Sequence, residues 1–265
     1  MYNLILADLF KLRKSMAIKI LFAITTVSAV IMTEMAYLIP QGKVDASMIG
    51  VGFLFSDIDM ISILGAVIAG IFICGDFDNK IIHDAIANGY SRAIVIASKA
   101  IVFCCAIAFI LLPYAIITGI GLSIGSKFSM GALSVGFLHL LTSEASTIFS
   151  TQEIWKLLVV MLTLMIVYMA QLSICVILAF VLKKPVLVVA IYYGLTIFCA
   201  QLMGLRGSSA VFDRIFACTP FGGNYTFVTL NSGTGDIFNA IFVSLIFMIV
   251  MLAATYCVFR KSEIK

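Results

Sequence analysis

Six long apolar stretches, separated by short polar segments, form the main pattern along the chain. Each stretch lacks the strict alternation of a barrel strand, and a helix of about 20 apolar residues crosses the hydrocarbon core of a bilayer. The pattern therefore predicts an all-α integral membrane protein with six transmembrane helices in one transmembrane domain, residues 1–265. The predicted spans cover about 18–38, 58–75, 100–124, 157–182, 185–205 and 237–259.

The distribution of basic residues predicts the orientation of these spans. Twelve of the 17 Lys and Arg residues lie at the two termini and in the segments after the second and fourth spans. Cytoplasmic segments of membrane proteins carry the excess of Lys and Arg, so both termini are expected in the cytoplasm. The net charge of +4 then reflects topology. The chain has no Lys/Arg-rich run of the kind that binds nucleic acid, and no nucleic-acid partner is expected.

The overall composition excludes a soluble protein. Hydrophobic residues make up 63% of the chain and charged residues only 11%, with a mean hydropathy of +1.17. Soluble domains are about 45–50% apolar and about 25% charged. A water-soluble chain of 265 residues could not bury this much apolar surface in one core.

The N-terminal segment 2–14 mixes apolar residues with three basic ones at helical spacing. This spacing predicts an amphipathic helix in the inner headgroup layer, with its basic residues near anionic lipid. The alternative is a plain positive flank that only sets the topology of the first span.

The segment 75–99, between the second and third spans, is the most informative part of the chain. It starts with two Asp residues, continues with apolar residues at helical spacing and reaches Asn88-Gly89, a helix-stop pattern. Ser91 can then cap a helix that runs into the third span. A short amphipathic helix, a turn and a restart are therefore expected at the cytoplasmic face, where such a helix suits docking of a soluble partner. A merely structured connection is the alternative.

Two outer segments, 127–153 and 206–236, are too apolar for free loops. Both are expected to lie on the outer leaflet or to dip into it. In the second segment, Pro220 and the Gly222-Gly223 pair would turn such a dip back outward.

Catalytic and nucleotide-binding motifs are absent from the sequence. There is no Walker A pattern, no HExxH and no GxSxG, so the chain is expected to be no enzyme and to need no cofactor or metal. Asp57 and Asp59 mark the predicted outer start of the second span, and the deep membrane carries Tyr and Gln in place of charges. This pattern argues against a proton-driven pump and against a selective ion pore.

These features together resemble an ABC-2 type transporter permease subunit, of the small bacterial six-span kind related to bacteriocin and antimicrobial-peptide exporters. The resemblance rests on the topology, on the segments 76–80 (DFDNK) and 87–92 (ANGYSR), and on Lys99. They resemble the family's acidic-plus-aromatic start, its Gly-x-Ser-Arg turn and its downstream Lys. Lys80 stands where relatives often carry Gly, and the outer Thr219-Pro220 pair also fits the family.

The resemblance implies a half-transporter in a bacterial cell membrane, without an ATPase of its own. Its partners would be a cytosolic ABC ATPase subunit, membrane lipid and a second permease, identical or related. The segment 76–88 would be the coupling helix, seated in a groove of the ATPase, and the cargo would be an amphipathic peptide, a lipid-like molecule or a drug. The ATPase-coupling residues would be Asp76, Phe77, Asp78, Asn79, Lys80, Ile81, Ile82, Asp84, Asn88, Gly89, Arg92 and Lys99. An outer re-entrant or gate segment would contain Phe216, Thr219, Pro220, Phe221 and Gly222.

The sequence leaves two other functions open. A secondary transporter driven by an ion gradient would need no ATPase, but the sequence has no evident inverted repeat and no charge predicted at the midplane of the membrane. A non-transporting membrane scaffold is the other alternative.

Overall fold

The computed structural model describes residues 1–45, 48–130, 134–144, 151–222 and 224–261. Within these residues, six helical segments are long and apolar enough to cross a membrane, which confirms the predicted fold class of a six-span, all-helical membrane protein. The spans are α2 (Met16–Leu38), a second span built from α3 (Ile49–Leu54), α4 (Asp57–Ala69), η2 (Gly70–Cys74) and α5 (Gly75–Asp78), α7 (Arg92–Ile124), α9 (Thr151–Leu182), α10 (Pro185–Met203) and α12 (Thr234–Lys261).

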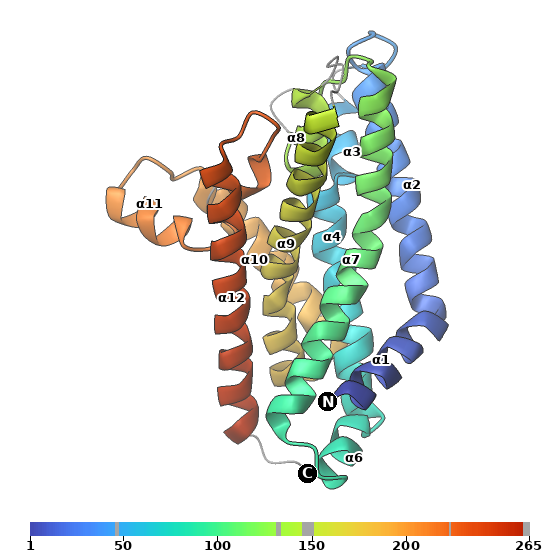
Figure 1. Cartoon of the computed structure of the whole chain (residues 1–265), viewed down its shortest axis with the longest axis vertical. Helices are drawn as coiled ribbons and strands as arrows, with labels where there is room; N and C mark the ends of the chain where they lie inside the picture. The colour runs from blue at the N-terminus through green and yellow to red at the C-terminus, as the bar shows by residue number, and fades with distance from the viewer. Residues whose placement is uncertain (46–47, 131–133, 145–150, 223, 262–265) are drawn as a thin grey trace.

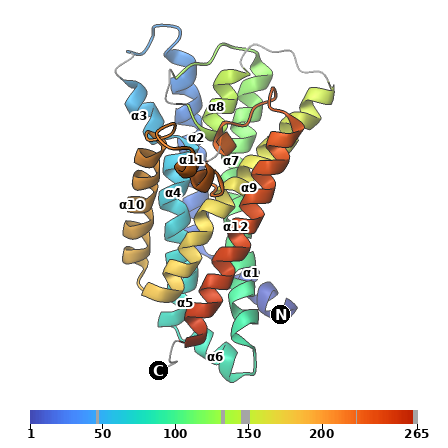
Figure 2. The same cartoon turned by 90° about the vertical axis from the view of Figure 1, so that its left-hand side faces the viewer.

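The spans run side by side along the long axis of the molecule, and shorter helices cover its two ends (Figures 1 and 2). We call one end the inner end, because it holds the basic helix α1 (Tyr2–Lys14), α6 (Ile81–Ala87) and the C-terminal end of α12. The opposite, outer end holds α8 (Gly136–Ser143). The positive-inside pattern predicts that the inner end faces the cytoplasm.

Helix α9 lies at the centre of the bundle and α10 and α12 lie at its periphery. In the most apolar stretch of each helix, about two thirds of the residues of α9 are buried, against 11% for α10 and 17% for α12. Most of the α9 side chains that pack in the core are apolar, for example Val160, Leu164 and Leu172. The long apolar faces of α10 and α12 are therefore the ones left for lipid or for a second subunit.

The N-terminal segment forms the expected helix, α1, which ends at a bend before the first span. Ser15 is extended there, with φ −64° and ψ 125°, and separates α1 from α2. Tyr2, Leu6 and Phe10 lie four residues apart and are exposed, so they form one apolar stripe on the helix surface. Such a stripe beside basic residues suits the headgroup layer of a membrane.

The second and third spans are longer than the sequence predicted. The second span begins at Ile49, not near residue 58, because the chain continues through a break at Phe55 and Ser56 into α3. The third begins at Arg92, because Ser91 caps α7 by accepting a hydrogen bond from the backbone N–H of Ile94 at 3.4 Å. The cap confirms the restart expected after Asn88-Gly89.

The two outer segments take different positions. In the first, Phe137, Leu138, Leu140 and Leu141 of α8 are fully buried, so α8 packs inside the outer end of the bundle. In the second, α11 (Ala210–Ala217) projects sideways from the bundle near the outer ends of α10 and α12 (Figure 1).

Helices α5 and α6 form an elbow that turns at Lys80. Lys80 has φ +58°, in the left-handed region that a Cβ disfavours, and it directly precedes α6. Gly would adopt this conformation without that steric cost. Asn79 and Asn88 each donate a side-chain hydrogen bond to the carbonyl four residues earlier, at 2.7 and 2.8 Å, and these bonds close the two short helices.

Substitutions at Lys80 test this backbone conformation. Lys80→Gly is expected to raise the free energy of unfolding by up to about 1 kcal/mol, since Gly adopts positive φ without the steric cost. Lys80→Val is expected to lower it by about 1–2 kcal/mol, because a β-branched side chain is the least tolerant of this region. Thermal unfolding in detergent measures the order Gly, Lys, Val. A Gly variant less stable than the parent would contradict the left-handed turn.

Candidate coupling site at the inner end

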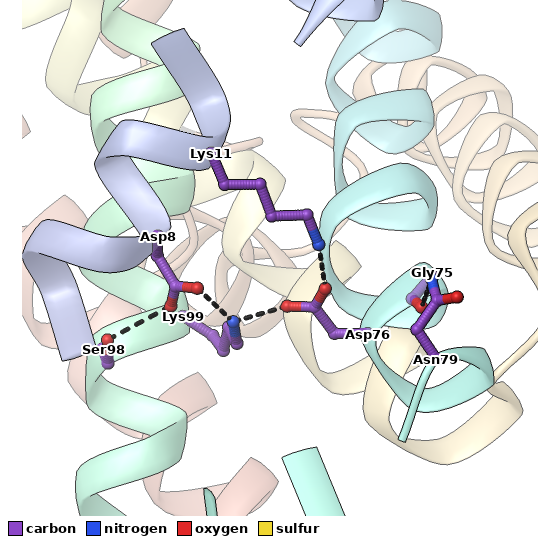
Figure 3. Close-up of polar contacts among 7 residues, drawn as sticks. All are labelled: Asp8, Lys11, Gly75, Asp76, Asn79, Ser98 and Lys99. Carbon is purple, nitrogen blue, oxygen red and sulfur yellow. Dashed lines mark hydrogen bonds and ion pairs between the residues drawn. The ribbon is translucent and has the colours of Figure 1, made fainter. Parts of the chain in front are cut away.

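A cluster of four charged side chains joins three elements at the inner end of the bundle (Figure 3). The Lys99 ammonium of α7 lies 2.7 Å from Asp8 Oδ1 of α1 and 2.5 Å from Asp76 Oδ2 of α5. Lys11 of α1 donates to the other oxygen of Asp76. Ser98 Oγ completes the set by donating to Asp8 Oδ2 at 3.4 Å. The cluster therefore holds the N-terminal helix against the second and third spans.

The burial of this cluster explains its composition. The side chains of Asp76 and Lys99 are only 1% and 5% exposed, and Asp8 is also buried. Charges removed from water to this degree must be paired and hydrogen-bonded, or they shift to the neutral form. Here each carboxylate oxygen has a donor, and the Lys99 ammonium has two carboxylate partners. The cluster therefore has a structural role: it holds the helices together, and each of its carboxylate oxygens is already hydrogen-bonded.

An aromatic cluster links the same elbow to the fourth and sixth spans. The ring of Phe77 in α5 meets Phe180 of α9 and Phe259 of α12 edge-on, with centroids 5.4 and 6.0 Å apart. Phe180 and Phe259 also contact each other, at 5.1 Å. The Lys183 ammonium lies 5.1 Å from the Phe77 centroid, in a cation–π contact. Phe77 is thus the point where α5, α9 and α12 meet.

Arg92 fixes the end of the sixth span. Its Nη1 donates to the carbonyls of Phe259 and Arg260 at 2.6 and 2.8 Å, and its guanidinium lies 5.4 Å from the Phe259 ring centroid. The last carbonyls of a helix have no partner within the helix and carry partial negative charge, so a cation there is stabilising. Arg92 thereby ties the start of α7 to the end of α12.

The predicted coupling residues divide into a buried layer and an exposed layer. Asp76, Phe77, Ile82 and Lys99 are buried, and Arg92 is half-buried. The exposed layer comprises Asp78, Asn79, Lys80, Ile81, Asp84, Asn88 and Gly89. Only the exposed layer is available to a partner, whereas the buried layer anchors the elbow to the spans.

Sequence reasoning missed the residues that complete the anchors. Asp8, Lys11 and Ser98 belong to the charge cluster, and Phe180 and Phe259 to the aromatic cluster. Asp8 carried the only available signal, because it is the single acid on an otherwise basic and apolar helix. Its partner Lys99 lies 91 residues away, a separation that no local pattern indicates.

The predicted outer segment forms a compact turn after α11. Thr219 Oγ1 donates to the Phe216 carbonyl at 2.8 Å, and a Cβ at Gly222 would collide with that same carbonyl group. Gln171 of α9 donates its side-chain amide to the Pro220 carbonyl at 2.9 Å, which ties the turn to the fourth span. Phe221 meets Phe247 of α12 edge-on at 6.4 Å. Gly223, the second half of the predicted pair, lies outside the described residues.

Asp57 has a role that the sequence did not indicate. The prediction placed it at the outer start of the second span, but it is fully buried inside the bundle. Its Oδ2 accepts hydrogen bonds from Tyr168 Oη of α9 and, at 3.0 Å, from the backbone N–H of Phe137 in α8. Its Oδ1 is buried and has no hydrogen-bond partner within the described part of the chain. Asp57 therefore joins the second span, the fourth span and α8.

The contact around Asp57 requires a glycine at position 136. Gly136 has φ +63°, and a Cβ there would collide with Tyr168 Oη and Asp57 Oδ2. Gly136→Ala is expected to lower the free energy of unfolding by at least about 2 kcal/mol, from overpacking and backbone strain together. Gly50→Ala is the matched control, because nothing lies within 4 Å of its Cβ position. Equal unfolding temperatures for the two variants would contradict this packing.

Comparison of the chain with protein-family models and with curated proteins found no match. Within the described residues, no group of His, Cys, Asp and Glu gathers in a way that would hold a metal ion. At the inner end, the small exposed elbow is connected to several spans by ion pairs and aromatic contacts.

Proposed function

We propose that the chain is the permease subunit of an ABC-2 type exporter, driven by a separate cytosolic ATPase. The α5–α6 elbow is the coupling element in this proposal, and its exposed layer is the surface that docks on the ATPase. A second permease, identical or related, completes the transporter in the cell membrane.

One observation carries this proposal: the exposed elbow is fastened to four other elements by buried contacts. Asp76 reaches α1 through Lys11 and α7 through Lys99. Phe77, the next residue, reaches α9 and α12. A loop that only connects two spans needs no such anchors and is usually much shorter. Anchors of this kind are what a surface helix needs if a push on it is to move transmembrane helices.

The linkage suggests how movement would pass through the chain. When ATP binding brings two ATPase subunits together, each coupling elbow would be displaced along the membrane surface. Because the buried charge cluster resists separation of its members, α1 and the inner end of α7 would follow the elbow. Bundles respond to such a displacement by discrete repacking of their helices, which can open a path for cargo.

The cargo is proposed to be an amphipathic peptide, a lipid-like molecule or a drug. The spans expose large apolar surfaces, notably on α10 and α12, and few charges. A sugar or a small ion would need a polar path through the membrane, which this composition does not supply.

Recovery of an ATPase with the tagged chain tests the proposal. The full chain, extracted from its native membrane in mild detergent, should bring with it a protein that hydrolyses ATP. Further purification in high salt should leave the chain alone, without ATP hydrolysis, because surface charge contacts weaken with ionic strength. A native-membrane preparation that contains intact chain and no associated ATP hydrolysis would count against the exporter.

Asp57 favours one second candidate, a transporter driven by an ion gradient. A carboxylate fully buried within a broken membrane span, with one oxygen lacking a partner among the described residues, is a typical proton or cation site. Vesicles that contain only this chain would then move cargo when a proton or sodium gradient is applied, and Asp57→Asn would abolish that movement. If cargo movement instead requires ATP and the ATPase and persists in Asp57→Asn, then Asp57 has only a packing role.

A further inference from the structure

A polar cavity opens at the outer ends of the fifth and sixth spans. It has a volume of about 390 Å³, and Arg206, Asn224, Asp236 and Asn239 line it together with Tyr225. Arg206 stands just beyond the end of α10, and Asp236 lies in the first turn of α12. Both charged groups therefore lie at the outer ends of two candidate spans, where the headgroups of the outer leaflet are expected.

The two charges of this cavity keep most of their bonding capacity. Arg206 donates from Nη1 to Asn224 Oδ1 at 2.9 Å, one of the five N–H groups of a guanidinium. Asp236 accepts at Oδ2 from the backbone N–H of Gly233 at 3.1 Å. No ion pair joins Arg206 and Asp236 in the described structure. The cavity thus presents one cation and one anion to an occupant.

A second, mostly apolar cavity of about 160 Å³ shares the lining residue Phe227 with the polar one. On α10 its lining consists of Thr196, Cys199, Ala200 and Met203. These positions follow the i, i+3, i+4, i+7 spacing of one helix face. Gln171 supplies a polar group at its wall. From Met203 to Thr196 the face descends by about 10 Å, at 1.5 Å per residue, into the membrane.

We propose that the two cavities form one binding site for a phospholipid with a zwitterionic phosphate-and-amine headgroup. The phosphate binds Arg206, the ammonium binds Asp236, and part of one acyl chain enters the apolar cavity. Guanidinium groups bind phosphate through paired N–H donors, and a carboxylate binds a primary ammonium through charge-assisted hydrogen bonds. This site goes beyond the proposed export function and does not depend on it.

Three features of the site favour a lipid over a peptide. Arg206 lies just beyond the outer end of α10, and the apolar lining on the same helix runs inward from Met203 to Thr196, an order that matches the head and chain of a lipid. One wall of the apolar cavity is formed by α10, the least buried of the six candidate spans in the described chain. The apolar cavity has a volume of only about 160 Å³, which can take a segment of an acyl chain but not a helix.

Native mass spectrometry of the purified full chain, without any ATPase, tests the site. The chain is mixed with phosphatidylethanolamine or with phosphatidylglycerol, which has the phosphate but lacks the amine. The parent is expected to retain phosphatidylethanolamine at least tenfold more than phosphatidylglycerol. Arg206→Gln should reduce retention of both lipids at least tenfold, whereas Arg214→Gln, on the exposed surface of α11, should leave it unchanged.

Two further variants separate binding from folding. Asp236→Asn should reverse the preference toward phosphatidylglycerol, a gain that an unfolded chain cannot show. Ala200→Trp, which fills the apolar cavity, should reduce retention of phosphatidylethanolamine at least tenfold. Ile197→Trp, on the exposed side of the same helix, should not. Equal retention of the two lipids by the parent, or the same retention in Arg206→Gln and Arg214→Gln, would overturn the proposal. Preferential retention of an amphipathic peptide over both lipids would also overturn it.

Discussion

Lys99→Met is expected to lower the free energy of unfolding by about 3–5 kcal/mol, the cost typical of removing one partner from a buried ion pair. Methionine fills a similar volume but leaves Asp8 and Asp76 buried without their shared cation. Lys11 still pairs with Asp76, so the uncompensated charge falls mainly on Asp8. Reversible unfolding of the chain in detergent micelles measures the effect.

A control variant and a double variant test whether the loss of stability in Lys99→Met comes from the buried charge cluster. Lys19→Met removes an exposed charge from α2 and is expected to change the free energy of unfolding by less than about 0.5 kcal/mol. The double variant Asp8→Asn, Lys99→Met removes the leftover charge and should recover part of the loss. If Lys99→Met and Lys19→Met have the same free energy of unfolding, the cluster does not hold α1 to the second and third spans.

Asp84→Lys is expected to reduce recovery of the ATPase with the chain at least tenfold. Asp84 lies on the exposed layer of α6, and an opposite charge in a docking surface introduces like-charge repulsion that costs about 1.4 kcal/mol for each tenfold. The stability of the chain itself should change little, because the side chain is exposed. The quantity to measure is ATP hydrolysis per chain in material eluted from membranes.

Matched variants assign the effect to the elbow. Asp45→Lys makes the same charge change in the outer segment after the first span and should keep the parental ATPase recovery. Asp78→Lys lies on the exposed layer of the elbow and should behave like Asp84→Lys. If both elbow variants recover as much ATPase as the parent chain does, the elbow is not the surface that docks on the ATPase.

The spans could be predicted because their signal is local and repeated. About 20 consecutive apolar residues leave few alternatives to a membrane helix. Helix ends with local chemistry were equally accessible: the cap at Ser91 and the stop at Gly89, which has φ +89°, lie where the sequence placed them. Lys80 adopts positive φ at the position where the resemblance to ABC-2 permeases implied a Gly in relatives.

The anchors could not be predicted because their partners are far apart in the sequence. Asp57 illustrates the difficulty: a carboxylate near the end of an apolar stretch usually marks the membrane surface, which sets the predicted start near residue 58. In the structure its charge is met by Tyr168, which lies 111 residues away, and by a backbone N–H of α8. Only the three-dimensional arrangement shows that the span continues outward to Ile49.

Photo-crosslinking in intact cells tests most directly whether the α5–α6 elbow docks on a cytosolic ATPase. A photoreactive p-benzoylphenylalanine at Asn88, on the exposed layer, is compared with the same group at Asn231, which is exposed at the outer end. We expect a light-dependent adduct between the chain and an ATP-binding protein from position 88 and none from position 231. The absence of such an adduct from position 88, with the chain correctly inserted in the membrane, would contradict this docking.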